Sequence, residues 1–280
     1  MNRVLSTHLF VNHRLTVAML DKIQRASIPA VEIFCARQHL DYRNTAQVNE
    51  LGHWFRDSEL KLHSLHSPMF TDEIWGRSGP QSVITITEPV KSKRFAMVDE
   101  IKRSIEVAES VPFRYLIQHV GTGGEAFDER KLDAAFSALD ELCLFAGHRG
   151  VEILLENIPN GFSSAERLVH FVNVTHLNLN FVFDTGHANL QGSAEGEFEI
   201  MKERVRSTHV HDNDGVSDSH LFPLGGPGGT IDWKRMMAAL RAREGQFPLL
   251  LELKEPSDTA HLLDRANEVF DKLENLRNDD

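Results

Sequence analysis

Cysteine is scarce in this chain of 280 residues, which contains only Cys35 and Cys143. Two cysteines allow one disulfide, but free thiols in a reducing compartment are the better interpretation. No segment has the roughly 18 consecutive apolar residues of a membrane span. The N-terminal MNRVLSTHLF also lacks the longer apolar run of a secretory signal peptide. These absences predict a soluble, cytoplasmic protein with no membrane partner.

Positively charged residues are also fewer than negatively charged ones. Lys and Arg number 30 against 41 Asp and Glu, so the formal net charge is -11. This balance disfavours a protein that holds nucleic acid by bulk positive charge. Hydrophobic residues make up 41% of the chain, which is enough for an ordinary globular core.

Short apolar segments alternate with longer amphipathic ones along the whole chain. The short segments predict strands at residues 4–10, 30–34, 60–66, 114–120, 151–156, 179–184, 206–212 and 248–253. The amphipathic segments predict helices at residues 16–27, 88–110, 129–150, 163–174, 195–205, 232–244 and 259–276. Ser163 or Ser164 is a candidate cap for the fourth of these helices, and Asp232 for the sixth. The last four residues, RNDD, predict a frayed end.

Eight strands alternating with helices favour an α/β fold, a single-domain (β/α)8 TIM barrel over residues 1–280. The alternative is a doubly wound open sheet, which would need a glycine-rich phosphate loop after its first strand. The segment THLFVNHRLT, residues 7–16, contains no glycine. The longest irregular connection covers residues 66–86, and its place after the third strand predicts a functional or mobile loop.

Six of the eight predicted strands end on a residue that can bind a divalent cation. These are His66, His119, Glu156, Asp184, either His209 or His211, and Glu252. Alternation puts the three carboxylates on the same faces as Leu154, Val182 and Leu250, two positions earlier in each strand. If those faces line the barrel interior, the groups converge at its C-terminal mouth, where only a cation would offset their burial. A mixture of imidazole and carboxylate suits Zn, Mn, Fe or Co.

Each of these residues has an ordinary interpretation when taken alone. A single carboxylate at a strand end is more often a helix cap or an ion-pair partner, and His66 before Pro68 is typical of a turn. The joint occurrence at six strand ends is what favours a metal site. The stretch HVHDNDGVSDSH, residues 209–220, adds a further concentration of histidine and aspartate.

Several motifs resemble one superfamily in order and spacing. They are HSPM, QHVG, LLENIPNG, FDTGHAN, HVHDND, DSH at residues 218–220, GGPGGTIDW and LLLELK. The chain is thereby identified as a member of the xylose isomerase-like TIM barrels, which group sugar and sugar-phosphate isomerases and epimerases with endonuclease IV. The resemblance covers nearly the whole chain and also implies a homodimer.

In the epimerase branch, the resemblance implies one divalent metal ion, Mn, Zn or Co. Its ligands map to Glu156, Asp184, Glu252 and a histidine of the seventh strand. His209 with Asp212 and His211 with Asp214 both fit the H-x-x-D pattern of the family. His209 aligns without a shift, with His211 as the alternative ligand and otherwise a substrate contact.

The resemblance also implies a reaction. Glu156 and Glu252 act as catalytic acid and base on the two faces of a sugar, through an enediolate. The other site residues contact the substrate: Glu32, His66, His119, His187, His211, Asp218 and His220. This predicts an isomerase or epimerase whose partner is a small-molecule sugar, sugar acid, polyol or sugar phosphate.

The endonuclease IV branch implies an alternative, a trinuclear-zinc apurinic/apyrimidinic endonuclease. Its additional zinc ligands map to His66, His119, His187, Asp218 and His220, all of which are present. The loops after the predicted strands argue against nucleic acid, because they carry Arg77 and Arg130 against many carboxylates.

Overall fold

The computed structural model describes residues 1–276; the predicted frayed end, RNDD, lies outside the described residues. The strands are β1 (Arg3–Ser6), β2 (Ala30–Phe34), β3 (Lys61–His66), β4 (Tyr115–His119), β5 (Glu152–Glu156), β6 (Asn180–Asp184), β7 (Val205–His209) and β8 (Leu249–Leu251). The helices are α1 (Val17–Arg25), α2 (Thr45–Arg56), α3 (Lys91–Glu106), α4 (Glu129–Gly147), α5 (Ala165–Val174), α6 (Thr185–Leu190), α7 (Ala194–Met201), α8 (Trp233–Arg241) and α9 (Leu262–Asn275).

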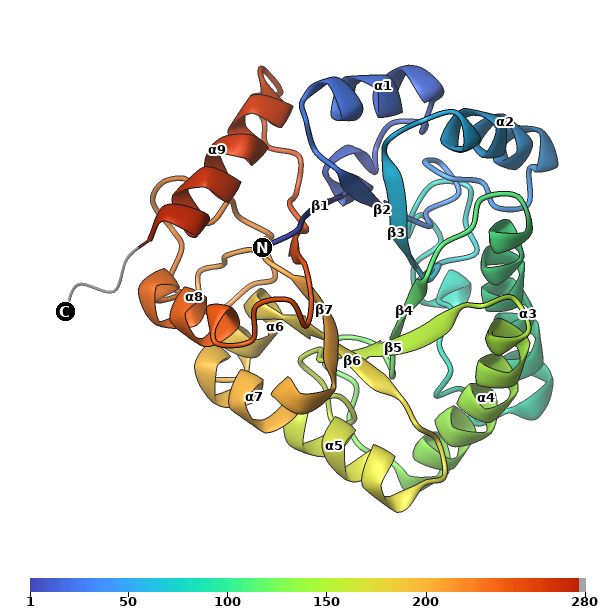
Figure 1. The fold of residues 1–280 in the computed structure, drawn as a ribbon. Coiled ribbons are helices and arrows are strands. Elements are labelled where there is room, and N and C mark those ends of the chain that lie inside the picture. Colours follow the sequence, from blue (N-terminus) through green and yellow to red (C-terminus); the bar gives the residue numbers. More distant parts are fainter. Residues whose placement is uncertain (277–280) are drawn as a thin grey trace.

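The strands form one parallel sheet in the order β7-β6-β5-β4-β3-β2-β1-β8, and helices surround it (Figure 1). The two edge strands meet just beyond β7. There the N–H of Val210 donates to the carbonyl of Leu250 at 2.8 Å, and the N–H of Glu252 donates to the carbonyl of Val210 at 3.3 Å. The sheet therefore closes into the predicted (β/α)8 barrel, and the open-sheet alternative is wrong.

Alternation along the strands sorts side chains between the barrel interior and the helices. Tyr115, Ile117, Leu154 and Val182 form a small cluster of their own, apart from the main core. Their strand neighbours pack instead in the large core between sheet and helices. Glu156 and Asp184 lie two positions after Leu154 and Val182, so they point to the interior as predicted.

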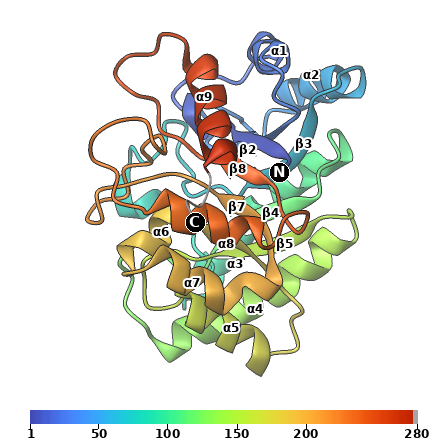
Figure 2. The same ribbon diagram turned by 60° about the vertical axis from the view of Figure 1, so that its left-hand side comes forward.

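Side-chain caps define where the helices begin. The hydroxyl of Ser164 accepts the N–H of Arg167 at the start of α5, and Asp232 accepts the N–H of Arg235 at the start of α8. Figure 2 shows α8 and α9 side by side on the outside of the barrel, where Arg241 donates to backbone carbonyls at the end of α9.

The main differences from the prediction concern two strand ends and two helices. The first strand stops at Ser6, because Thr7–Phe10 forms a 3-10 helix that begins at a side-chain cap. The seventh strand stops at His209, so His211 and Asp212 lie beyond it. Helices α2 and α6 were not predicted, since Gly52 interrupts the pattern of the first and the second has only six residues.

The two cysteines do not pair with each other. Burial raises the pKa of Cys143 to about 11 and raises that of Cys35 further. Both are therefore protonated thiols at neutral pH, as expected of inert cysteines rather than metal ligands. Within residues 1–276, no helix combines the length and the apolar character that crossing a membrane requires.

The amphipathic character of α4 generates a stability prediction. Leu139 is fully buried against the barrel, whereas Leu144 on the same helix is 67% exposed. Leu139→Ala should lower the free energy of unfolding by about 2–5 kcal/mol. Leu144→Ala, the matched control, should change it by less than about 0.5 kcal/mol. Urea denaturation followed by circular dichroism measures both, and equal effects would contradict the assignment of the buried face.

Candidate metal centre

The C-terminal ends of six strands supply the side chains of the candidate site. His66, His119, Glu156, Asp184 and His209 are the last residues of β3 to β7, and Glu252 directly follows β8. His119 is partly exposed, and the others are buried. In a parallel barrel all these ends open on one face, which brings together residues up to 186 positions apart in the sequence, from His66 to Glu252.

A central group consists of Glu156, Asp184, His209 and Glu252, whose ligand atoms all lie within 4.8 Å of one another. The Nδ1 atom of His209 lies 3.0 Å from Glu156 Oε1, 3.4 Å from Glu252 Oε2 and 3.9 Å from Asp184 Oδ2. Three buried carboxylates thus face one imidazole nitrogen. Such a set is costly to bury unless protons or a cation compensate it.

Glu32 holds the other nitrogen of this imidazole. Its carboxylate lies 3.2 Å from His209 Nε2 and accepts hydrogen bonds from Ser6 Oγ at 3.1 Å and Ser64 Oγ at 2.8 Å. A carboxylate partner favours the proton on Nε2, which leaves Nδ1 free to face the other three acids. Glu32 is fully buried and is not among the residues that line the cavity above these groups. Its predicted hydrogen bond to a sugar stays a prediction, and in this structure its contacts are with His209, Ser6 and Ser64.

Charge pairing shifts the pKa values inside the central group. Burial opposes protonation of His209, but Glu252, Glu156 and Glu32 outweigh it and raise the pKa of His209 well above its ordinary value. Burial likewise raises the pKa of Glu156, but His209 and His119 outweigh it and hold that pKa well below the usual range. Without a cation, a proton on His209 and the charged form of Glu156 therefore favour each other.

Besides the central group, His211, His220 and Glu252 form one further group of candidate metal ligands, and two more groups flank the central one. His66 and His119 lie beside Glu156, with His119 Nε2 3.0 Å and His66 Nε2 3.6 Å from its Oε2 atom. Together with Glu156 they form one group of candidate metal ligands. Glu156 thus belongs to both this group and the central one.

The second flanking group comprises His187, Asp218 and His220. Asp218 Oδ2 lies 3.2 Å from His187 Nε2 and 3.3 Å from His220 Nε2. Burial opposes protonation of His220, but Asp218 and Glu252 outweigh it and raise the pKa of His220 to about 9. His220 adopts a left-handed backbone with φ of 46°, a conformation that side chains other than glycine rarely adopt and that is common at functional positions.

His211 lies behind the cavity rather than in it. It is fully buried, stacks on His220 with ring centroids 3.9 Å apart, and places Nε2 3.0 Å from Asp184 Oδ2. A Cβ atom at Gly186 would lie 2.0 Å from this ring, which explains the glycine of the D-T-G-H motif. In this structure His211 therefore contacts Asp184, and its predicted roles as the alternative metal ligand or a substrate contact stay predictions.

A cavity of about 230 Å³ opens directly above these groups. Its walls include all the remaining predicted substrate contacts: His66, His119, His187, Asp218 and His220. Glu156 and Glu252 also line it. Five further wall residues were not predicted from the sequence: His8, Phe34, Met69, Trp75 and Lys254. Phe34 is the last residue of β2, so its position at a strand end could have identified it. It was not predicted because a phenylalanine side chain neither binds metal nor transfers protons.

The long connection between β7 and α8 is anchored by Asp212. This buried carboxylate accepts the N–H groups of Thr230 at 3.0 Å and Ile231 at 3.2 Å, and Nε1–H of Trp233 at 2.6 Å. Asp214, the other aspartate of the two H-x-x-D matches, is exposed and caps a turn at Val216. Asp212 therefore folds the glycine-rich G-x-I-D-W segment back beside the site.

Removing this anchor should loosen the connection without touching the central group. Asp212→Ala leaves the N–H of Ile231 and the Nε1–H of Trp233 without their acceptor, so we expect faster proteolytic cleavage within residues 213–229 and a loss of about 1.5–3 kcal/mol of stability. Limited chymotrypsin digestion with mass spectrometry measures the cleavage, because residues 213–229 contain Leu221, Phe222 and Leu224 but no Lys or Arg. Asp214→Ala is the matched control and should leave the cleavage rate near that of the unmodified protein. Unchanged cleavage in Asp212→Ala would contradict the anchoring role.

The chain is similar to proteins of known structure and to a curated relative. The uncharacterized protein MJ1311 of Methanocaldococcus jannaschii is 28% identical over 228 residues, which cover 77% of this chain and 72% of that protein. A D-tagatose 3-epimerase-like protein superposes with a TM-score of 0.75 at 23% identity, covering 98% of both chains. The IOLI protein with a binding zinc atom superposes with a TM-score of 0.76 at 16% identity, also covering 98% of both. At these identities the two structures establish the shared fold.

The sequence pattern that defines the xylose isomerase-like TIM barrels matches residues 20–278. This match agrees with the closed eight-stranded barrel and with the ligand-type residues at its strand ends. The chain therefore belongs to the xylose isomerase-like TIM barrel family.

Proposed function

We propose that this protein is a divalent-metal-dependent isomerase or epimerase that acts on a small sugar or sugar derivative. The observation that carries the proposal is the pair Glu156 and Glu252, which lie 3.0 Å and 3.4 Å from His209 Nδ1 and both line the 230 Å³ cavity. Proton transfer at carbon needs two such groups, one to remove a proton and one to return it. The cavity is smaller than the roughly 300–1,000 Å³ of sites for drug-sized ligands, which suits a single sugar unit.

The donor set fits a divalent cation. Bonds of about 2.1 Å to carboxylate and imidazole donors place those donors up to about 4.2 Å apart. The ligand atoms of the central group already lie within 4.8 Å of one another, so only a small contraction would bring them around one ion. Glu156, Asp184, His209 through Nδ1 and Glu252 would hold the ion, which we expect to be Mn, Zn or Co. A bound cation supplies polarisation of the sugar's carbonyl and hydroxyl oxygens, which acidifies the adjacent C–H.

The residues around the cavity complete the reaction. One of Glu156 and Glu252 removes a proton from the carbon next to the carbonyl, and the other donates a proton to the opposite face or the neighbouring atom. Five polar wall residues would position the hydroxyl groups of the sugar through hydrogen bonds: His66, His119, His187, Asp218 and His220. The Nε1–H of Trp75 has no hydrogen-bond partner in the described structure, so it is a further donor for the sugar.

Glu32 acts on His209 rather than on the substrate. By accepting from Nε2, it fixes the ring orientation and raises the basicity of Nδ1, the atom that would bind the cation. Ser6 and Ser64 hold Glu32 from below. Glu32 is therefore a positioning residue of the proposed centre.

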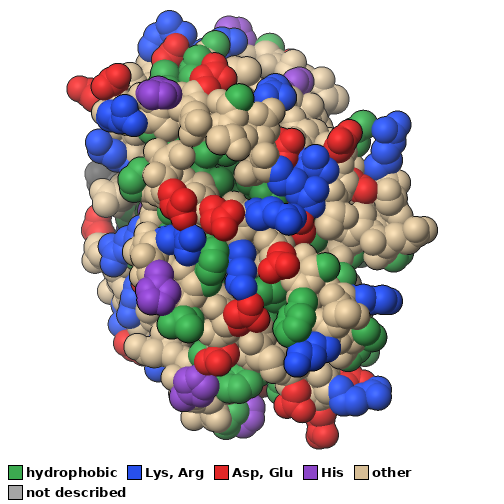
Figure 3. All heavy atoms as spheres, turned by 90° about the vertical axis from the view of Figure 1, so that its right-hand side faces the viewer, with side chains coloured by type: hydrophobic (Ala, Val, Ile, Leu, Met, Phe, Trp, Pro, Cys, Tyr) green, Lys and Arg blue, Asp and Glu red, His purple; other side chains and the backbone are tan. Residues whose placement is uncertain are grey.

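A second candidate function follows from the two flanking groups. His66 with His119 and Glu156, and His187 with Asp218 and His220, offer two more sites of zinc-ligand type. Three zinc ions would suit hydrolysis of a phosphodiester at an abasic site. The charge distribution does not favour this alternative: the net charge is -11, and Figure 3 shows Lys and Arg interspersed with Asp and Glu across the face around α3 and α4.

Replacing one member of the glutamate pair should stop the reaction while leaving the fold intact. For Glu252→Gln we expect a loss of at least about 100-fold in turnover, because the amide neither accepts nor donates the proton. The measurement is proton exchange with deuterated water, followed by NMR on a panel of ketoses and aldoses. Glu244→Gln, an exposed residue far from the site, is the control. Full activity in a cooperatively folding Glu252→Gln protein would refute the acid and base assignment.

Metal content tests both the ligand set and the choice between the two functions. After loosely bound ions are removed, we expect about one equivalent of Mn, Co or Zn per chain by elemental analysis. His209→Gln should lose it and His211→Gln should retain it, because only His209 faces the three carboxylates of the central group. The reverse result would make His211 the ligand. Three equivalents of zinc, with cleavage of an abasic-site oligonucleotide, would favour the second candidate function.

A further inference from the structure

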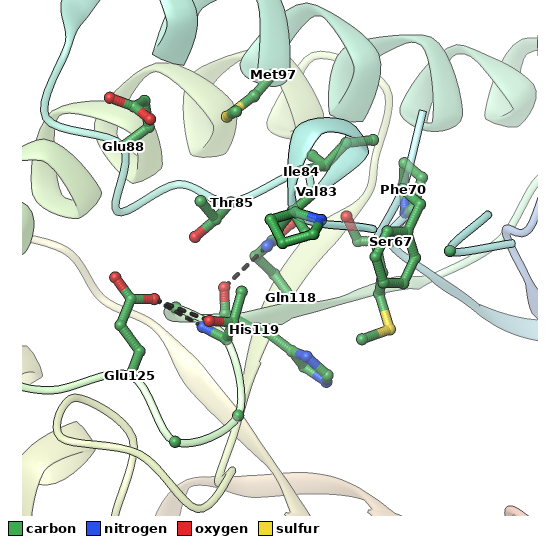
Figure 4. Close-up of a pocket in the computed structure, with 18 of the residues that line it drawn as sticks. Ser67, Phe70, Val83, Ile84, Thr85, Glu88, Met97, Gln118, His119 and Glu125 are labelled. Atoms are coloured by element: carbon green, nitrogen blue, oxygen red, sulfur yellow. Dashed lines mark hydrogen bonds between the residues drawn. The ribbon is translucent and has the colours of Figure 1, made fainter. Parts of the chain in front are cut away.

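A second and larger cavity lies beside the proposed active site. It has a volume of about 710 Å³ and lies between the connection that follows β3 and the loop between β4 and α4 (Figure 4). His66, Met69 and His119 line both this cavity and the 230 Å³ cavity. The two therefore adjoin at the proposed metal centre, and we call the larger one the side cavity.

Apolar side chains make up most of its wall. The connection after β3 contributes Met69, Phe70, Val83 and Ile84, and α3 contributes Met97. Figure 4 shows Val83 and Ile84 above the cavity and Phe70 at one end of it. Burying an apolar group against such a wall is favourable by about 25 cal/mol per Å².

The charged groups at the rim are already compensated. Glu125 lies 2.7 Å from Lys131 Nζ and accepts the N–H of Thr122 at 2.9 Å. Burial raises the pKa of Glu125, but Lys131 outweighs it and holds that pKa below its usual value. Glu88 accepts the N–H of Val90 at 2.8 Å. No unpaired cation is left among the described wall residues to receive a phosphate or carboxylate, so the cavity suits an uncharged ligand.

Two wall residues retain unused hydrogen-bonding capacity. Ser67 Oγ and Gln118 Oε1 are buried and have no hydrogen-bond partner in the described structure. Gln118 is held through its other end, since Nε2 donates to the carbonyl of His119 at 2.9 Å. Buried polar atoms without partners are uncommon and costly. An O–H or N–H group on a ligand would satisfy the Gln118 acceptor after a small side-chain adjustment.

We propose that the substrate is a glycoside of a keto sugar, in which a ketone on a ring carbon other than the anomeric one makes the neighbouring C–H acidic. Its aglycone is an uncharged, largely apolar ring with a hydrogen-bond donor, and this ring occupies the side cavity. The inference rests on the proposed function for the sugar half of the molecule. The smaller cavity holds one sugar unit over Glu156 and Glu252. The side cavity, whose volume is typical of ligand sites, holds the ring.

The first experiment uses the aglycone alone, so that it does not depend on the sugar chemistry. Benzyl alcohol should bind the metal-loaded full-length protein in ligand-detected NMR, and Val83→Trp should reduce the signal at least fivefold by filling the side cavity. Met97→Trp serves as a second filling variant if Val83→Trp fails to unfold cooperatively. Val216→Trp adds the same side chain at a position that is 86% exposed in another loop, and should leave binding unchanged. Absence of binding, or binding insensitive to both filling variants, would overturn the inference.

The second experiment adds the sugar. By calorimetry, 4-(hydroxymethyl)phenyl glucoside should bind at least tenfold more tightly than methyl glucoside, and Val83→Trp should remove that advantage. Equal affinities would overturn the inference while leaving the isomerase proposal standing. Conversely, benzyl alcohol binding that Val83→Trp abolishes, together with no proton exchange on any sugar, would support the side cavity and count against the proposed function alone.

Discussion

The arrangement of three buried carboxylates around one imidazole nitrogen is the constraint on which the rest of the site depends. Glu156, Asp184 and Glu252 repel one another at these distances unless positive charge lies between them. His209 supplies part of that charge, and Glu32 keeps its ring turned so that Nδ1 faces the acids. The surrounding histidines compensate buried carboxylates in the same way. Each of them lies beside a carboxylate oxygen: His66, His119, His187, His211 and His220.

Two buried aspartates near the site, Asp184 and Asp212, also stabilise the local backbone. Asp184 caps α6 by accepting the N–H of His187 through Oδ1, and its Oδ2 atom faces the central group. Asp212 uses both oxygens to anchor the connection that returns beside the site. The ordinary interpretation of a strand-end acid as a helix cap is therefore correct for Asp184, and it does not exclude a role in binding a cation.

The two adjoining cavities follow from how the loops at the barrel mouth are built. The connection after β3 supplies Met69 and Trp75 to the smaller cavity and Phe70, Val83 and Ile84 to the larger one. One long loop thus shapes both spaces, while the strand ends supply the polar floor. This division places the proposed chemistry on the rigid sheet and the choice of substrate on the loop.

The sequence by itself determined the barrel, the approximate strand positions and the residue types at the strand ends. These features are local: apolar runs set the strands, and alternation with period two sets which residues share a face. The caps at Ser164 and Asp232 are local as well. Because both H-x-x-D matches satisfy the same local pattern, the sequence left His209 and His211 as alternatives.

Only the tertiary structure decided which of these residues meet. The seventh strand ends at His209, and the chain then turns, so His211 lies behind Asp184 while His209 faces the acids. Glu32 lies under His209, and Phe34 and Trp75 line the cavity, because of the pairing of neighbouring strands and the path of one long loop. Such contacts join residues as far as 177 positions apart, as in the pair Glu32 and His209. They depend on how the barrel closes, which no local pattern contains.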